Sequence, residues 1–308
     1  MTAETGAGAD APIVIGVDGS EHAAQAVRWG ASEAARRAAR LLLVHALGIP
    51  SQYMGPWPPS HELREKLAER GRALLENAEK IARQAADVEV STWIDNDNSS
   101  EVLIEASRSA LMVVLGATGH GGFLAGLAVG STATQTTSHA HSPVVIVRGD
   151  DVENRPGDQP IVVGVDGSPR CDTALGYAFA EAALRGVPLI AVHAWYDNEA
   201  VADVIDEARF VSHESVDSIE RNVLEESLTG WKDKYPNVSV QSVVEHDKPR
   251  RKLLELSTVA QLVVVGSRGW GGFRGLLLGS TGQALMHHAD CPVMVVRPQP
   301  ESAEVRSS

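Results

Sequence analysis

Short apolar runs alternate along the first half of the chain with longer segments of mixed character. The runs are rich in β-branched residues, and apolar runs of this length between polar residues predict buried strands. They occupy residues 13–18, 41–46, 88–95, 111–116 and 143–148. The segments between them are alanine-rich or carry apolar residues at helical spacing, which predicts helices. These lie at residues 20–40, 61–86, 99–109 and 131–141.

Strands that alternate with helices predict a parallel sheet with helices on both faces. We therefore expect an α/β fold in which this part of the chain forms a Rossmann-like unit with a five-stranded parallel sheet. Ser20 stands where its side chain can cap the first helix. The second half of the chain repeats the plan, with its long helical region near 199–232.

Four sequence blocks occur twice in the same order. IVIGVDGS at 13–20 returns as IVVGVDGS at 161–168, and VVLGATGHGG returns as VVVGSRGWGG. LVHA and SPVVIVR return in the same way as AVHA and CPVMVVR. Matched blocks at nearly constant spacing predict a duplicated domain, so two tandem units are expected. The predicted division is a disordered leader at 1–11, domains at 12–148 and 161–297, a linker at 149–160 and a tail at 298–308.

Composition and charge exclude several classes of protein. The chain has 308 residues, of which 44% are hydrophobic and 22% charged, as in ordinary globular proteins. Its net charge of −13 argues against broad binding to nucleic acid or acidic membranes. The two cysteines, Cys171 and Cys291, lie far apart and suggest neither a disulfide framework nor a zinc site. The N-terminus does not resemble a signal peptide, and no apolar stretch approaches membrane-spanning length, so a cytoplasmic protein is expected.

Glycine-rich segments follow the fourth predicted strand of each half, at 113–132 and 263–281. In an open parallel sheet, ligands bind outside the carboxyl ends of the strands. Two further loops of each unit leave such ends, one after the first strand and one after the second. We expect all three loops to meet at one edge of the sheet and to form a ligand site there.

The glycine segments have the chemistry of a phosphate cradle. Glycine tolerates positive φ, so Gly116 and Gly119, like Gly266 and Gly269, are expected to turn successive N–H groups toward one point. A Gly-Ser-Thr sequence then opens a helix, whose N-terminus offers further donors and a favourable dipole. The aspartate after the first strand of each unit is a suitable acceptor for sugar hydroxyls or an adenine amine.

Other nucleotide motifs and other chemistries do not fit the sequence. There is no GxxxxGK[ST] sequence, and GVDGS differs from the dinucleotide-binding GxGxxG pattern. The loop also differs from the SGG pyrophosphatase loop of related adenine-nucleotide ligases. The histidines at the ends of predicted helices and second strands lack a partner at metal-ligand spacing, and we expect structural roles for them. They are His45, His139, His141, His193, His287 and His288.

The glycine pattern G-x2-G-x9-G-[ST], together with an aspartate after the first strand, resembles the ATP-binding signature of the universal stress protein family. The second copy matches it fully, with Gly266, Gly269 and then Gly279 followed by serine. In the first copy, ten residues rather than nine separate Gly119 from Gly130. The resemblance extends over residues 12–297, and the repeat resembles the tandem type found in actinobacteria.

The resemblance implies one ATP site per unit, with or without Mg²⁺. The aspartates and the glycines before them would border the adenosine, two alanines would contact the adenine through their backbone, and the glycine loops would hold ribose and phosphates. In the first unit these are Gly16, Asp18, Ala46, Gly116, Gly119, Gly130, Ser131 and Thr132. In the second they are Gly164, Asp166, Ala194, Asp197, Gly266, Ser267, Arg268, Gly269, Gly271, Gly272, Gly279, Ser280 and Thr281. Arg268 would add positive charge, which Thr118 in its place in the first unit does not.

Two hypotheses for function follow. The favoured one is an ATP-binding regulatory or stress-response module with little or no turnover, because no P-loop lysine, positioned general base or arginine finger is evident. The alternative is an adenine-nucleotide-dependent hydrolase or transferase that uses the same sheet edge. The last strand of each unit presents an edge that is expected to pair, between the halves or between chains, and the resemblance implies a homodimer.

Overall fold

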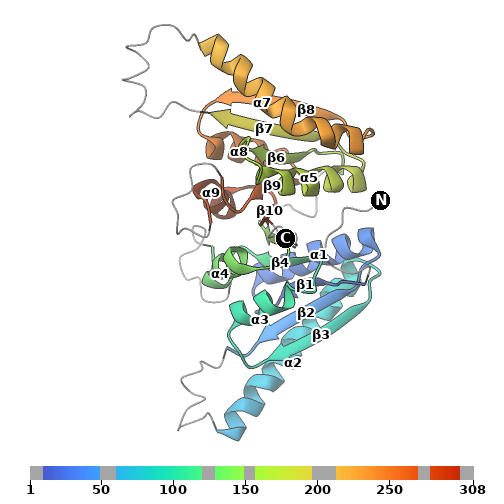
Figure 1. Ribbon diagram of the computed structural model, residues 1–308. Helices are drawn as coiled ribbons and strands as arrows, with labels where there is room; N and C mark the ends of the chain where they lie inside the picture. Colours follow the sequence, from blue (N-terminus) through green and yellow to red (C-terminus); the bar gives the residue numbers. More distant parts are fainter. Residues whose placement is uncertain are drawn as a thin grey trace, which may run out of the picture.

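The structure is a computed structural model that describes residues 10–48, 60–119, 129–148, 157–195, 213–269 and 278–298. Strands and helices alternate in both halves of the chain (Figure 1). Unit one contains β1 (Ile13–Gly16), α1 (Glu21–Arg37), β2 (Leu41–Ala46), α2 (His61–Ala85), β3 (Val90–Asp95), α3 (Ser99–Ala106), β4 (Met112–Gly116), α4 (Ser131–His139) and β5 (Val144–Val147). Unit two contains β6 (Ile161–Val165), α5 (Cys171–Arg185), β7 (Leu189–Trp195), α7 (His213–Lys234), β8 (Val240–His246), α8 (Pro249–Ser257), β9 (Leu262–Gly266), α9 (Ser280–His288) and β10 (Val293–Val296).

The strands of both units join in one ten-stranded sheet with the order β3-β2-β1-β4-β5-β10-β9-β6-β7-β8. Within each unit, neighbouring strands are parallel. The units meet where β5 and β10 pair antiparallel, with Met294 opposite Val145. This pairing confirms the expectation that the last strands cover each other's edges. In Figure 1, unit one (blue and green) occupies the lower half of the view and unit two (yellow to red) the upper half.

Helices cover both faces of the sheet, as the alternation of strands and helices predicts. Side chains alternate across a strand, so Ile13 and Ile15 lie in one apolar cluster and Val14 lies in the other. The first cluster includes residues of α1, α2, α5 and α7, whereas the second includes residues of α3, α4, α8 and α9. Each cluster draws on both units, so the two cores are continuous across the β5–β10 pair.

Capping residues set the starts of several helices. The Ser20 side chain accepts a hydrogen bond from the Ala23 N–H at 3.1 Å, as expected for α1. Ser60 caps α2 in the same way through the Leu63 N–H at 3.2 Å. At the other end of unit one, α4 ends at His139, two residues earlier than predicted. His141 lies beyond the helix, where its backbone N–H donates to Ser107 Oγ at 2.8 Å.

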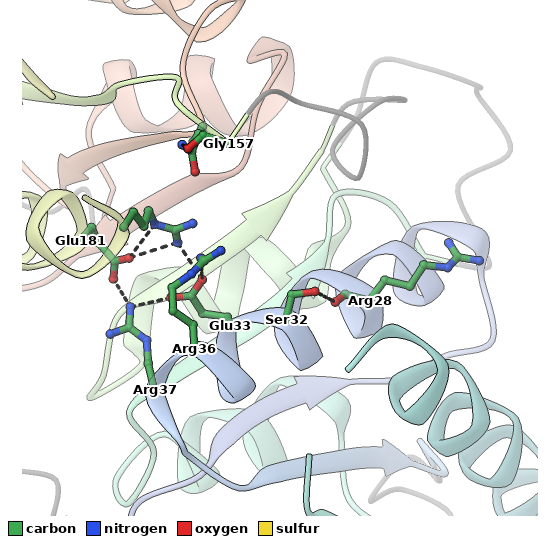
Figure 2. Close-up of polar contacts among 9 residues, drawn as sticks. Arg28, Ser32, Glu33, Arg36, Arg37, Gly157 and Glu181 are labelled. Carbon is green, nitrogen blue, oxygen red and sulfur yellow. Dashed lines mark hydrogen bonds and ion pairs between the residues drawn. The ribbon is translucent and has the colours of Figure 1, made fainter. Parts of the chain in front are cut away.

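A buried ionic cluster joins the C-terminal ends of α1 and α5 (Figure 2). Glu33 and Arg37 are paired within α1, and Glu181 and Arg185 are paired within α5. Two further pairs cross between the units, one between Arg37 and Glu181 and one between Arg185 and Glu33 at 2.7 Å. Burial raises the pKa of the Glu181 carboxyl and Glu33 raises it further, while the two arginines lower it.

None of the helices in the described ranges has the length and apolar character needed to cross a membrane. The leader, the linker and the tail lie largely outside these ranges, and the domain boundaries expected from the sequence stay predictions.

Candidate functional site

A cavity of about 580 Å³ opens at the carboxyl ends of β1, β2 and β4 in unit one. The walls come from the loop after β1, the end of β2, the residues after β4 and the start of α4. All eight residues predicted for the first site line it. They are Gly16, Asp18, Ala46, Gly116, Gly119, Gly130, Ser131 and Thr132. Three loops and a helix start, far apart in the sequence, therefore meet at one edge of the sheet.

The loop after β1 holds Asp18 in a fixed position. One carboxylate oxygen, Oδ1, accepts hydrogen bonds from the backbone N–H of Ser20 at 2.9 Å and from its hydroxyl at 2.6 Å. The same hydroxyl caps α1. Gly19, between the two residues, has a φ of +83°, which favours glycine. Gly19 is not among the residues predicted for the site, although the aspartate–glycine–serine order is typical of such a turn.

The prediction that the loop glycines adopt positive φ was wrong. Among the described residues, Gly116, Gly119, Gly266 and Gly269 do not have positive φ. These glycines instead allow neighbouring atoms to lie close to the backbone of the loop. A β-carbon on Gly116 would lie 2.6 Å from the backbone carbonyl carbon of His22, and one on Gly119 would lie 2.6 Å from Asp18 Oδ2. Glycine is therefore required at position 116, where the neighbour is backbone, whereas a side chain at position 119 would have to displace the Asp18 carboxylate.

The start of α4 supplies backbone donors to the cavity wall. Its N-cap is Gly130, which has no side chain that could satisfy the first N–H groups of the helix. The Gly130 N–H itself donates to the Ala117 carbonyl at 3.0 Å, and this bond closes the base of the loop. The N–H groups of Ser131 and Thr132 stand at the positive end of the helix dipole and suit an anion.

Unit two repeats this geometry in the residues that the structure describes. Ser168 donates to Asp166 Oδ1 from its backbone at 3.0 Å and from its hydroxyl at 2.7 Å. Gly167 has a φ of +73°. Gly164 and Ala194 lie in β6 and β7, while Ser280 and Thr281 begin α9 after the N-cap Gly279. Asp197, Gly271 and Gly272 lie outside the described residues.

Although the first loop has one extra residue, its two ends make two contacts that the ends of the second loop also make. The Gly279 N–H donates to the Ser267 carbonyl at 2.8 Å, which corresponds to the bond between Gly130 and Ala117. A β-carbon on Gly269 would lie 3.0 Å from Asp166 Oδ2, the same neighbour that Gly119 has in unit one. The described ends of the two loops therefore share these two contacts, although the first loop is one residue longer.

Ser267 and Arg268 are placed differently from each other. Ser267 is only 1% exposed, and its hydroxyl has no hydrogen-bond partner in the described part of the chain. Its backbone, by contrast, closes the loop. Arg268 is exposed at the end of β9. Burial lowers the pKa of Arg297, and the charge of Arg268 lowers it further, so these two arginines are close enough to repel each other.

The histidines near the ends of β2 and β7 are held by hydrogen-bonding contacts with the protein. His45 Nδ1 lies 2.6 Å from the Val17 carbonyl, and His193 Nδ1 lies 2.9 Å from the Val165 carbonyl. His193 also contacts Glu220 at 2.8 Å through Nε2. In the ranges that the structure describes, no group of three or more His, Cys, Asp or Glu side chains is arranged to hold a metal ion.

Two contacts at the first site involve residues whose roles sequence reasoning missed. The Thr118 hydroxyl lies 2.8 Å from Nδ1 of His22, beside the cavity. His287, from α9 of the other unit, contacts the backbone of Val129 in the cavity wall. No sequence signal indicates either contact, because each depends on how helices distant in the chain pack in space.

Comparisons with known proteins agree with this fold and site. Residues 11–148 and 159–297 each match the model of the universal stress protein family, and the chain belongs to this family with two tandem copies. A universal stress protein of Mycobacterium tuberculosis is 41% identical over 290 residues, which cover 92% of this chain and 96% of that protein. A universal stress protein of Mycolicibacterium smegmatis is 39% identical over 293 residues, which cover 93% of this chain and 97% of that protein.

A solved structure supports the same fold. The crystal structure of a universal stress protein from Archaeoglobus fulgidus aligns with a TM-score of 0.68 at 20% identity, over 93% of this chain and 98% of that chain. This likeness confirms the α/β fold class expected from the sequence, and the match of the family model confirms the family resemblance.

Proposed function

We propose that this chain binds ATP, one molecule per unit, and acts as a nucleotide-dependent regulatory module in the stress response. The observation that carries the proposal is the cavity of unit one. Its volume of about 580 Å³ lies in the range of small-molecule sites. Its lining combines a carboxylate, the glycines that follow β4 and a helix N-terminus.

The distribution of polar groups suits an adenine nucleotide. Adenine would lie against the backbone of Ala46, and Asp18 would accept from the ribose or the base, in line with the family resemblance. The phosphates, with or without Mg²⁺, would lie between Gly116, Gly119 and the start of α4. Backbone N–H groups and the helix dipole hold phosphate there even though the chain carries a net charge of −13.

Binding would act by biasing conformation rather than by consuming ATP. Slow turnover is expected at site one, because the described residues that line its cavity include no lysine or arginine that could stabilise a phosphoryl-transfer transition state. We further propose that the protein works in the cytoplasm and as a homodimer. Since β5 and β10 already pair with each other, such a dimer would form through a different surface.

Isothermal titration of the full chain with ATP tests the proposal. The chain should bind two molecules of ATP, whereas Gly119→Glu and Gly269→Glu should each bind one. The new side chain in each variant would fill the loop beside Asp18 or Asp166 and repel phosphate. The double variant should bind none.

Gly157→Glu is the matched control, because a β-carbon there meets no atom within 4 Å. This variant should bind ATP as the parent does. No heat of binding from the parent protein would overturn the proposal. Phosphate release far above background, lost in Asp166→Ala, would favour a hydrolase instead.

A further inference from the structure

Val129 fixes the start of α4 at the first site. It lines the cavity, is 8% exposed and immediately precedes the N-cap Gly130. The direction in which the first N–H groups of α4 point therefore depends on where the backbone of Val129 is held. These N–H groups are the donors assigned above to phosphate.

Unit two holds this backbone in place. The Val129 N–H donates a hydrogen bond to Nδ1 of His287, in the last turn of α9, at 3.3 Å. Because Nδ1 accepts, the ring proton of the neutral imidazole lies on Nε2. A second contact reaches the other end of α4, where Arg297 donates to the carbonyl of Ser138. Helix α4 is thus held near both ends by residues that follow β9.

The contact is not repeated in the opposite direction. At the repeat spacing of these segments, Val129 corresponds to Leu278 and His287 corresponds to Ser138. Serine is too short to reach as far as an imidazole, and the Ser138 hydroxyl donates to the Thr134 carbonyl of its own helix at 2.8 Å. The duplicated chain has therefore become asymmetric at this point.

We propose that His287 is a positioning residue for the first nucleotide site, so that unit two completes the site of unit one. The inference rests on the proposed function, since it concerns the same cavity. His287 does not line the cavity and acts only through the backbone of Val129. ATP binding at site one should consequently depend on His287 of unit two. ATP binding at site two should not depend on the corresponding residue of unit one, Ser138.

Titration of the full-length chain with ATP in the Gly269→Glu background measures site one alone. His287→Ala and His287→Ser should weaken ATP binding about fivefold, which corresponds to about 1 kcal/mol for one hydrogen bond. Serine is a fair replacement because unit one carries it at the equivalent position. His287→Asn should restore most of the affinity, since its amide oxygen stands where Nδ1 stands and accepts the same hydrogen bond.

His288→Ala is the matched control, because this neighbouring histidine is exposed and ends the same helix. It should leave the affinity of site one unchanged. In the Gly119→Glu background, which leaves site two, His287→Ala should also have no effect. Equal losses at both sites, no loss at site one, or failure of asparagine to restore binding would each overturn the inference. Absence of ATP binding in both parent backgrounds and in the unmodified chain would instead overturn the proposed function.

Discussion

A β-carbon on Gly116 or on Gly119 would lie 2.6 Å from a neighbouring atom. The nearest neighbours are the backbone carbonyl group of His22 and the carboxylate of Asp18. The sequence singles out these glycines because they stand beside a predicted strand end. The physical reason could not be read from the sequence, since the close neighbours belong to the first loop and to α1, about a hundred residues earlier.

Gly116→Ala should destabilise the protein by about 1–3 kcal/mol, the usual cost of overpacking. The new methyl group would meet rigid backbone rather than a mobile side chain. Urea unfolding of the full chain measures this loss. Gly266→Ala is the matched variant of unit two, and its nearest neighbour lies 3.3 Å away, so its loss should be smaller. Equal losses in the two variants would contradict the account.

Ser267→Ala should leave the protein as stable as before or raise its stability by about 1 kcal/mol. The substitution removes a buried hydroxyl that has no partner in the described residues. Unit one already carries Ala117 at the equivalent position. Thermal unfolding measures the change in stability. ATP titration of site two is the second check, because a marked loss of affinity would show that the hydroxyl contacts the nucleotide.

Most elements could be predicted because local patterns determine them. The apolar runs became the five parallel strands of unit one, and Ser20 caps α1 as its position indicated. The ionic cluster between α1 and α5 could not be predicted. Glu33 and Arg37 look like an ordinary helical pair in the sequence, and only the packing of the two units brings Glu181 and Arg185 against them.

Arg185→Ala should destabilise the protein by about 3–5 kcal/mol, because it leaves two buried carboxylates short of a partner. The Arg185 side chain is 6% exposed, and it contacts both Glu33 and Glu181. Arg83→Ala is the matched control. It breaks a pair with Glu79 of similar geometry, but its side chain is 63% exposed, so the loss should stay below about 1 kcal/mol. Similar losses in both variants would contradict a buried interhelical role.

At the scale of the whole molecule, the β5–β10 pair turns a duplicated sequence into one continuous sheet. The repeats predicted two units, and the last strands predicted pairing either between the halves or between chains, of which the structure shows the first. The clustering of the first site also followed from the sequence, because parallel strands bring their carboxyl ends to one edge. The contact of His287 with Val129 of unit one could not be predicted from the sequence, since it depends on the angle at which the units meet.

The two units should unfold together in a single calorimetric transition. Both apolar clusters contain residues of both units, so neither unit can lose its core without exposing that of the other. Differential scanning calorimetry of the full chain checks this directly, through agreement of the calorimetric and van't Hoff enthalpies. Two separate transitions would show that the shared sheet does not couple the units.

Each unit is proposed to hold one adenine nucleotide at its edge of the sheet. Equilibrium dialysis of the full chain against labelled ATP tests this claim most directly, because it counts bound molecules without assuming any effect of binding. The unmodified chain should bind two ATP molecules at saturation, and Asp18→Ala should bind one. Saturation at one or at zero in the unmodified chain would contradict this.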